Sequence, residues 1–403
     1  MFDNEFPPLG GGTGVVNFHL LEEMSRRPDV VVDLVTSSRS RMRYETERFA
    51  DRITIYKVPV DNQNIHHATN RELLRYSWRG LWQARRLLSQ HRYDVSVAFA
   101  GVPAGAISLV LRLTHGLPYV LSLQGPDVPW FEARYNYLYP VLTPLITRIW
   151  RKAGAVTAIS AEQVALAHRT MPDLPLVTIP NGVDTNSFGP AARAPGRPFT
   201  MICVARLIER KGQHHLLQAF ARLRAVSSEP MALIFVGTGD AESQLRELAE
   251  HLKVTEAVTF RGFVPREHMP RVYQEADIFV LPSQHEGMSI ALLEAMASGL
   301  PVIVTDTGGT AELVTQGANG EIVPWADVPT LTTALQRLLK DGEHRRRMGA
   351  ESRRRALAFG WPALAARYLE LCARVAVPSV ESRAKAPRGS EKVARDLSRE
   401  PRA

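Results

Sequence analysis

Short apolar runs alternate with amphipathic helical stretches along most of the chain. In the first half, the apolar runs that predict strands span residues 30–35, 53–56, 95–99, 119–123, 155–159 and 176–179. Helical patterns lie between them at residues 14–27, 71–90, 104–114, 135–152 and 161–170. Because parallel strands are buried on both faces and need helical crossovers, this alternation predicts a parallel, doubly wound α/β sheet.

A second series of the same kind follows. Residues 188–198 are rich in Gly, Pro, Ala and Arg, which predicts a linker. Strands are then expected at residues 199–204, 232–236, 258–260, 276–281 and 302–304, with only helices after Pro324. The prediction is two α/β domains, residues 1–187 and 199–360, with a final helix over residues 361–376 that completes the first domain.

Length and composition agree with this division. A chain of 403 residues is long enough for two domains, and 45% hydrophobic residues are ample for ordinary cores. No apolar run approaches the roughly 20 residues of a membrane helix, and residues 1–8 lack the features of a secretion signal. Cys203 and Cys372 fall in a predicted strand and a predicted helix, which excludes a disulfide framework. We therefore expect a cytoplasmic protein.

The net charge of +8 narrows the expected partners. The tail, residues 377–403, holds seven Lys/Arg against four Asp/Glu and few large apolar residues, which predicts a disordered basic tail. A mildly basic body suits a protein that handles phosphates or contacts anionic lipid headgroups. No nucleic-acid-binding motif accompanies this charge, so nucleic acid is not an expected partner.

A glycine loop, residues 10–14, introduces the first helix in the manner of a loop that cradles a ligand. Such a loop normally follows a buried central strand. Only nine residues precede it here, and they include Pro7, Pro8 and several polar side chains. Either the first strand is very short or the start is truncated, and we favour truncation.

Two glutamates, Glu286 and Glu294, mark the most informative segment, residues 282–301. A strand leads into the loop that carries Glu286, at the edge where open α/β sheets bind ligands. The helix begins near Ser289, so Glu294 lies about one turn in. Free backbone N–H groups would point at a ligand from Gly287, Met288 and Ser289. Either carboxylate alone is explained by helix electrostatics, but a second strand end with a glycine loop, residues 305–309, favours a ligand site.

The second domain also begins with a cationic loop. Arg206 follows a strand end, and Lys211 comes at the next helix start. Two fixed cations beside a helix amino end predict a pyrophosphate clamp, since Arg binds in bidentate fashion and Lys as a point charge. A solvated basic loop is the alternative, and we prefer it for Arg210. The nearby Gly237 belongs to a partial dinucleotide fingerprint that lacks its third glycine, which is weak evidence.

With these motifs in this order, the chain resembles the retaining, nucleotide-sugar-dependent glycosyltransferases of the family-4 type. The resemblance implies the GT-B fold, an α/β architecture of two Rossmann-like, doubly wound parallel-sheet domains that face a cleft. It covers nearly the whole chain apart from the tail. The matching segments are residues 6–14, 179–184, 205–212, 237–240, 260–264, 282–301 and 307–309.

The resemblance also implies roles for the residues in these motifs. Arg206 and Lys211 would bind the donor diphosphate and stabilise it as a leaving group. Glu294 would accept hydrogen bonds from the ribose, and Glu286 would orient the donor sugar without a covalent bond. The other donor contacts would be Gly11 and Gly12 at the phosphate, Gly237 near the nucleotide, Phe263 and Val264 at the base, and the amides of Gly287, Met288 and Ser289. No Asp-x-Asp motif fits these positions, so neither a metal nor another cofactor is expected.

One position departs from the family pattern. Many relatives carry a histidine in the first-domain loop after the strand equivalent to residues 119–123, and here Gln124 takes that place. Glutamine can bond a sugar hydroxyl but does not titrate near neutrality. Gln124 and Asp127 are therefore expected on the acceptor side, with orientation as their role.

Other candidate groups are weaker. The scattered histidines have no metal-ligand spacing and are interpreted as packing or surface residues: His19, His66, His67, His214 and His215. Aromatic residues beside several Arg on two helices suggest a peripheral membrane contact, although core packing with a solvated basic face is the favoured interpretation. They are Trp78, Trp82, Tyr135, Tyr137, Tyr139 and Trp150.

The leading hypothesis is a glycosyltransferase that moves a sugar from a nucleoside diphosphate donor to a hydroxyl acceptor, a glycan or lipid-linked glycan, with retention. The alternative is a catalytically impaired sugar-nucleotide-binding or scaffold protein, because the first strand looks clipped and Gln124 replaces a histidine. A nicotinamide oxidoreductase fails on the glycine spacing.

Overall fold

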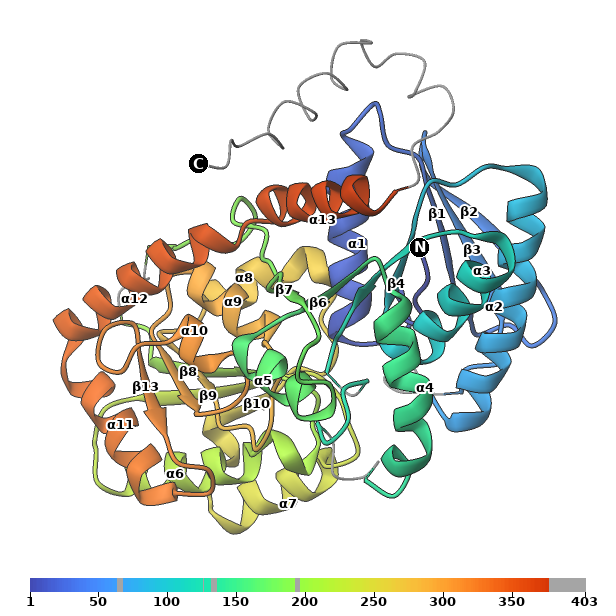
Figure 1. The fold of residues 1–403 in the computed structure, drawn as a ribbon. Helices are drawn as coiled ribbons and strands as arrows, with labels where there is room; N and C mark the ends of the chain where they lie inside the picture. The colour runs from blue at the N-terminus through green and yellow to red at the C-terminus, as the bar shows by residue number, and fades with distance from the viewer. Residues whose placement is uncertain (64–67, 126, 132–135, 193–195, 377–403) are drawn as a thin grey trace, which may run out of the picture.

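The computed structural model describes residues 1–63, 68–125, 127–131, 136–192 and 196–376. Two α/β units lie side by side, each built on its own sheet (Figure 1). The predicted disordered tail and the predicted roles of His66, His67 and Tyr135 lie outside the described residues. Among the described residues, no helix is long and apolar enough to cross a membrane.

The first sheet runs through two groups of strands. Their order is β2-β3-β1 and β4-β5-β6-β7. The strands are β1 (Val32–Ser38), β2 (Glu45–Ala50), β3 (Ile53–Pro59), β4 (Ser96–Phe99), β5 (Tyr119–Ser122), β6 (Ala155–Ala158) and β7 (Leu176–Thr178). All pairs in these two groups are parallel except β2 with β3. The predicted parallel sheet thus carries at this edge an antiparallel strand, β2, that sequence analysis did not predict.

Three residues at the start of the chain join the two groups. Phe2 donates its N–H to the Val97 carbonyl at 2.8 Å, and the Phe99 N–H donates to the Phe2 carbonyl at 3.0 Å. On the other side, Val35 donates to the Met1 carbonyl at 2.9 Å. Phe2 thus bridges β1 and β4 as a parallel neighbour of both. An isolated bridge at Phe2 therefore stands before α1, and the interpretation of the chain start stays a prediction.

Helices cover both faces of this sheet. On one face, α1 packs beside α13 over a core that includes Leu20, Leu34 and Trp361 (Figure 1). The other face carries α2, α3 and α4 over a core that includes Tyr76, Ile107 and Trp150. The helices are α1 (Gly12–Ser25), α2 (Asn70–Gln90), α3 (Ala106–His115), α4 (Tyr139–Lys152), α5 (Ala161–Thr170) and α13 (Trp361–Val375), with a short π-helical turn at Gly101–Gly105.

The second sheet is parallel throughout its six strands, in the order β10-β9-β8-β11-β12-β13. The strands are β8 (Phe199–Val204), β9 (Met231–Val236), β10 (Val258–Phe260), β11 (Ile278–Leu281), β12 (Val302–Thr305) and β13 (Gly320–Val323). Sequence patterns predicted all of these except β13. The helices are α6 (Gln213–Ala225), α7 (Glu242–His251), α8 (Met269–Gln274), α9 (Ile290–Ala297), α10 (Thr310–Leu313), α11 (Val328–Lys340) and α12 (Gly342–Ala356).

The second core is held between helices on both faces of that sheet, with α6 beside α11 and α9 beside α12. The ends of β8, β11 and β12 open at one edge, because parallel strands share the same direction. The candidate site residues of this domain come from the loops at that edge. The chain then returns through α13 to the first sheet, where the Tyr368 hydroxyl hydrogen-bonds the Ser122 hydroxyl at 2.8 Å.

Candidate active site

Glu286 lies in the loop between β11 and α9, and two neighbours hold its carboxylate. The Lys211 ammonium donates to Glu286 Oε1 at 2.5 Å, and the Ser283 hydroxyl donates to the same oxygen at 2.7 Å. Lys211 ends a short 3-10 turn, Glu209–Lys211, that leads into α6. The next residue, Gly212, has φ +70, and a Cβ there would overlap the Pro282 carbonyl. Glycine therefore lets the loops after β8 and β11 touch and brings Lys211 to Glu286.

This pair is nearly buried, with side-chain exposures of 13% for Lys211 and 15% for Glu286. Burial raises the pKa of Glu286, but the Lys211 charge, the bond from Ser283 and the charge of Arg210 together hold that pKa below its usual range. Glu286 is therefore an oriented carboxylate, and Lys211 is a cation fixed at the sheet edge.

Glu294 lies in α9, which begins after Ser289. The Ser289 hydroxyl accepts from the Leu292 N–H at 3.3 Å and caps the helix. Glu294 Oε2 accepts from the Tyr273 hydroxyl at 2.9 Å, and Arg266 approaches Oε1 at 3.6 Å. Burial raises the pKa of Glu294, while Arg266 and Tyr273 oppose that rise. Sequence reasoning missed these two partners, because they come from the segment after β10 and carry no motif of their own.

Arg206 and Gly237 come from neighbouring loops at the same edge. The Gln213 side chain donates to the Arg206 carbonyl at 2.9 Å and fixes the backbone of that residue. Gly237 has φ +127, and a Cβ there would overlap the Ala205 carbonyl. Gly237 thus allows the loops after β8 and β9 to pack closely. Farther along the edge, Phe263 is 70% exposed and Val264 packs against the core.

The first domain faces this edge with the amino end of α1. The position that a Cβ of Gly12 would take lies 3.8 Å from Ile290 Cδ1, in the first turn of α9. Asn181 also crosses between the domains and donates to the Met288 carbonyl at 2.9 Å. The amide N–H of Gly11 is bonded to Glu5 Oε2 at 2.8 Å. Sequence reasoning did not single out Glu5, although it is the one acidic residue between Asp3 and Gly11.

Asp127 and Gln124 take part in one loop after β5. The Asp127 carboxylate accepts three backbone N–H groups, from Gln124 and Gly125 at 2.9 Å each and from Gly101 at 2.8 Å. The Gln124 amide donates to the Ser122 hydroxyl at 2.8 Å. The structure therefore uses Asp127 to shape the loop and turns the Gln124 amide toward the sheet.

His285 is a further polar residue at the domain junction that sequence reasoning missed. Its ring meets the Phe131 ring edge-to-face at 4.4 Å, and its Nε2 is buried without a hydrogen-bond partner. Its place next to Glu286 in the sequence was the available signal. Within the described ranges, no three His, Cys, Asp or Glu side chains cluster as metal ligands.

The geometry joins Lys211 to Glu286 and sets the first turn of α9 against the amino end of α1. Arg206 and Glu294 lie in the same domain, in the loop after β8 and in α9. Comparison with known proteins identifies the class. The family model Glycosyltransferase Family 4 matches residues 10–187, and the model Glycosyl transferases group 1 matches residues 186–355.

Individual relatives agree. The chain is 32% identical over 305 residues to a GDP-mannose-dependent alpha-(1-6)-phosphatidylinositol monomannoside mannosyltransferase of Mycolicibacterium smegmatis, covering 71% of this chain and 78% of that protein. It is 33% identical over 317 residues to an MMP alpha-(1->4)-mannosyltransferase of Mycolicibacterium hassiacum, covering 73% and 75%. The fold matches sucrose-phosphate synthase from Thermosynechococcus elongatus with a TM-score of 0.79 at 22% identity, over 90% and 92% of the chains.

The chain therefore belongs to the group 1 glycosyltransferases of family 4, and it has the GT-B fold. The sequence-based prediction of family and fold is confirmed. Retention of configuration, the roles of individual site residues, the donor and the acceptor remain predictions.

Proposed function

We propose that the protein transfers a sugar from a nucleoside diphosphate sugar to a hydroxyl acceptor, with retention of the anomeric configuration and without a metal. The observation that carries this proposal is the buried Lys211–Glu286 pair at the carboxyl edge of the second sheet. A fixed ammonium there would neutralise charge that develops on the leaving diphosphate, as a metal ion does in other enzymes. Arg206 would add a guanidinium that binds two phosphate oxygens.

The carboxylates would then hold the rest of the donor. Glu286, kept ionised by Lys211, would accept hydrogen bonds from the sugar hydroxyls beside the first turn of α9. Glu294, whose carboxylate is held by Tyr273 and Arg266, would accept hydrogen bonds from the ribose hydroxyls. Because Glu286 would be hydrogen-bonded to the sugar hydroxyls, it would orient the donor sugar and would not act as a nucleophile. The leaving phosphate would help to deprotonate the acceptor on the same face of the sugar.

The relatives suggest which substrates to try first. The Mycolicibacterium smegmatis relative is named as GDP-mannose-dependent and as acting on a phosphatidylinositol monomannoside. We therefore propose a hexose donor, with GDP-mannose as the first candidate, and a glycan or lipid-linked glycan as the acceptor.

Release of nucleoside diphosphate from a panel of GDP- and UDP-sugars tests the proposal. Lys211→Ala and Glu294→Ala should each lower the rate at least 100-fold, the usual cost of removing a group that stabilises transition-state charge or holds the substrate. The exposed Lys340→Ala and Glu247→Ala serve as matched controls and should retain the wild-type rate. If all four variants released nucleoside diphosphate at the same rate, the assignment of Lys211 and Glu294 to the donor site would be refuted. Tight donor binding without turnover on any acceptor would instead favour the scaffold alternative.

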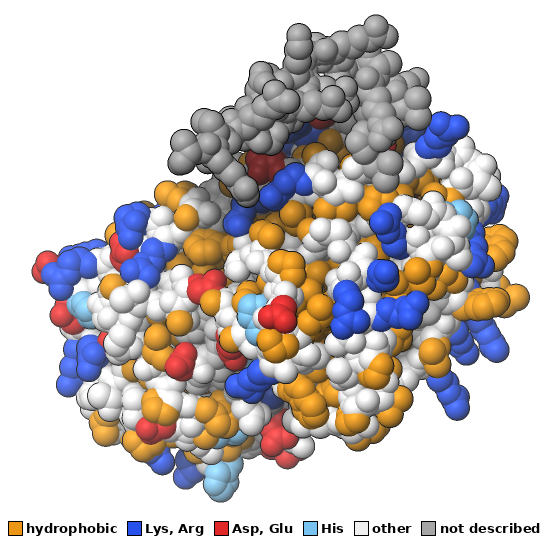
Figure 2. Space-filling view, in the orientation of Figure 1, with side chains coloured by type: hydrophobic (Ala, Val, Ile, Leu, Met, Phe, Trp, Pro, Cys, Tyr) orange, Lys and Arg blue, Asp and Glu red, His pale blue; other side chains and the backbone are white. Residues whose placement is uncertain are grey.

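We further propose a peripheral contact with an anionic membrane face, through the outer face of α2. Leu74, Trp78 and Trp82 follow one another at four-residue spacing and are 71%, 75% and 51% exposed. The expectation that the aromatic residues pack in the core holds for Tyr139 and Trp150 but is wrong for Trp78, Trp82 and Tyr137. Apolar and basic side chains intermix on the surface of the first domain (Figure 2).

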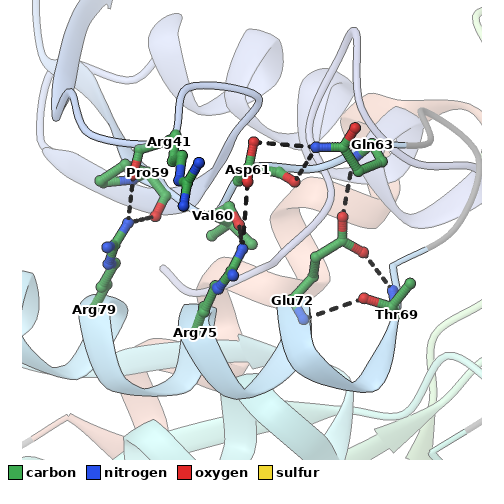
Figure 3. Close-up of polar contacts among 9 residues, drawn as sticks. All are labelled: Arg41, Pro59, Val60, Asp61, Gln63, Thr69, Glu72, Arg75 and Arg79. Atoms are coloured by element: carbon green, nitrogen blue, oxygen red, sulfur yellow. Dashed lines mark hydrogen bonds and ion pairs between the residues drawn. The ribbon is translucent and has the colours of Figure 1, made fainter.

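The charges of α2 complement an anionic surface. Its exposed positions include Arg71, Arg75, Arg85 and Arg86, while its single acid, Glu72, is buried. Figure 3 shows Glu72 turned inward, where it accepts from the Gln63 N–H at 2.9 Å and from the Thr69 N–H. Exposed aromatic rings beside arginines are typical of helices that lie in a membrane interface.

Sedimentation with vesicles tests this contact. The protein should bind vesicles of phosphatidylglycerol and phosphatidylcholine, and binding should fall at high salt. The double variant Trp78→Ser/Trp82→Ser should lose most of the binding, whereas Val226→Ser, which removes an exposed apolar side chain elsewhere, should not. Equal binding by both variants would exclude α2 as the contact. With its two cysteines unpaired, we propose that the protein works at the cytoplasmic face.

A further inference from the structure

Glu5 lies against the glycine loop that opens α1. Gly10 has φ +94, and a Cβ there would overlap the Glu5 side chain, so glycine makes room for this glutamate. Glu5 Oε2 then accepts the Gly11 N–H at 2.8 Å. Gly11 is the residue before the first helical turn, where backbone N–H groups have no partner within the helix. A side-chain carboxylate of the protein thus fills an anion-binding position.

The surroundings of Glu5 come from both domains. The positive charge of Arg206, in the second domain, favours the ionised form of Glu5, and so does the bond from Gly11. Burial works the other way and is the larger effect, so the pKa of Glu5 lies above its usual range. Glu5 in turn raises the pKa of the buried Asp3. Burial therefore disfavours the ionised form of Glu5, which lies between the loop of one domain and a cation of the other.

We infer, on the basis of the proposed function, that the Glu5 carboxylate occupies the place of a donor phosphate group and that the incoming diphosphate displaces it. Gly11 and Arg206 are the two groups expected to bind phosphate from opposite domains. The Glu5 carboxylate accepts the Gly11 N–H and lies within range of the Arg206 charge. The Glu5 carboxylate and a donor phosphate are both anions and repel each other, so they cannot both bind at the Gly11 amide.

Glu5 is thereby a specificity-determining residue of the donor site. A ligand must carry enough negative charge to replace a carboxylate, which a nucleoside diphosphate does and an uncharged nucleoside does not. Neutralising Glu5 should remove this competition. The variant Glu5→Gln keeps an oxygen that accepts the Gly11 N–H, so the loop retains its hydrogen bond while the charge is lost.

Calorimetric titration with GDP, UDP and guanosine tests the inference on the full chain. Glu5→Gln should bind the diphosphates about tenfold more tightly than the wild type, with no change for guanosine. The exposed Glu162→Gln is the matched control and should bind as the wild type does. If Glu5 only supported the structure of the loop, Glu5→Gln would change the affinity for the diphosphates and for guanosine alike.

The outcomes distinguish this inference from the proposed function. Wild-type protein that binds a diphosphate, with Glu5→Gln binding equally or more weakly, would overturn the role of Glu5 and leave the function standing. If neither protein binds GDP or UDP, the donor site itself is wrong, and both proposals fall. A crystal structure of the wild-type complex gives an independent check, because Glu5 Oε2 should then lie beyond hydrogen-bond distance of the Gly11 amide.

Discussion

Asp127 concentrates three backbone hydrogen bonds on one carboxylate. The bonds come from Gly101, Gln124 and Gly125, so a single side chain ties the loop after β5 to the turn after β4. Burial raises the pKa of Asp127, and the bonds from Gln124, Gly101 and Gly125 oppose that rise. The loop that faces the second domain therefore depends on both oxygens of Asp127 as hydrogen-bond acceptors.

Asp127→Asn should destabilise the protein by about 1–3 kcal/mol, because the amide keeps only one acceptor oxygen and turns an NH2 donor toward the backbone N–H that the other oxygen had accepted. Urea denaturation measures this change, with the exposed Asp94→Asn as the control. A variant of unchanged stability with a higher KM for acceptor would show instead that Asp127 contacts the acceptor, as the sequence predicted.

Residues of the candidate site differ in how far the sequence could identify them. Lys211, Glu286 and Glu294 stand at strand ends and helix starts, where chemistry can be predicted from position. Glu5 bonds Gly11 from only six positions away, but it belongs to no motif that would identify it. Arg266 contacts Glu294 from a distant part of the chain, and no local pattern marks that contact. The role of Asp127 was missed for the same reason, since its partner Gly101 lies 26 positions away.

At the scale of elements, α9 and α12 pack through glycine. A Cβ at Gly349, in the middle of α12, would overlap the carbonyl oxygen of Gly299, the residue that follows α9 and its C-cap. Gly342, in the first turn of the same helix, has only the flexible Arg345 side chain near its Cβ position, at 3.5 Å. One helix thus offers two glycines with opposite surroundings.

Gly349→Ala should lower the free energy of unfolding by about 1–3 kcal/mol through overpacking, despite the better helix propensity of alanine. Gly342→Ala should leave it unchanged or raise it by up to about 1 kcal/mol. Thermal unfolding of the two variants makes the comparison. Equal effects at both positions would show that α12 does not pack closely on α9.

The elements that sequence analysis missed have a common physical cause. Strand β2 carries three charged side chains, Glu45, Glu47 and Arg48, and is exposed along most of its length, so no apolar run marks it. Strand β13 opens with Gly320 and Glu321, and both are buried. Glu321 is tolerated there because Arg337 pairs with it at 2.9 Å. The continuous apolar strands β8, β9 and β11 were predicted because both of their faces are covered.

At the scale of the whole molecule, His19 lies where several distant segments meet. Its ring stacks on Trp361 of α13 at 5.1 Å, and its Nδ1 contacts Glu22 at 2.6 Å. Burial and, after it, the charge of Arg266 from the second domain lower the pKa of His19 to about 3, while Asp184 opposes both. The folded protein therefore keeps this imidazole neutral at physiological pH.

This shift has a definite sign. In the unfolded chain His19 takes up a proton below its ordinary pKa of 6.5, whereas the folded protein takes it up only near 3. Stability is therefore lost as the pH falls from 6.5 toward 3. His19→Phe should lose about 2 kcal/mol less than the wild type between pH 7 and pH 5.

Urea denaturation at the two pH values measures that difference, and the exposed His251→Phe should behave as the wild type. The carboxyls whose pKa is raised, such as Glu294, contribute stability at low pH that is lost as the pH rises. They are common to all three proteins and cancel in the comparison. A wild-type slope in His19→Phe would show that His19 is protonated in the folded state.

The return of the last described helix to the first domain also sets an order of events during synthesis. The sheet that contains β5 receives Tyr368 from 246 positions away, so the part of its apolar face beside α1 stays uncovered until the ribosome has made nearly the whole chain. Most of the second core lies within residues 199–356, joined by Ile159, Val183 and Phe188, so the second domain can fold earlier. A nascent chain stalled before Trp361 would carry one finished domain and one with an open hydrophobic face. Chaperones would be expected to engage that face, and release from them would coincide with the arrival of α13.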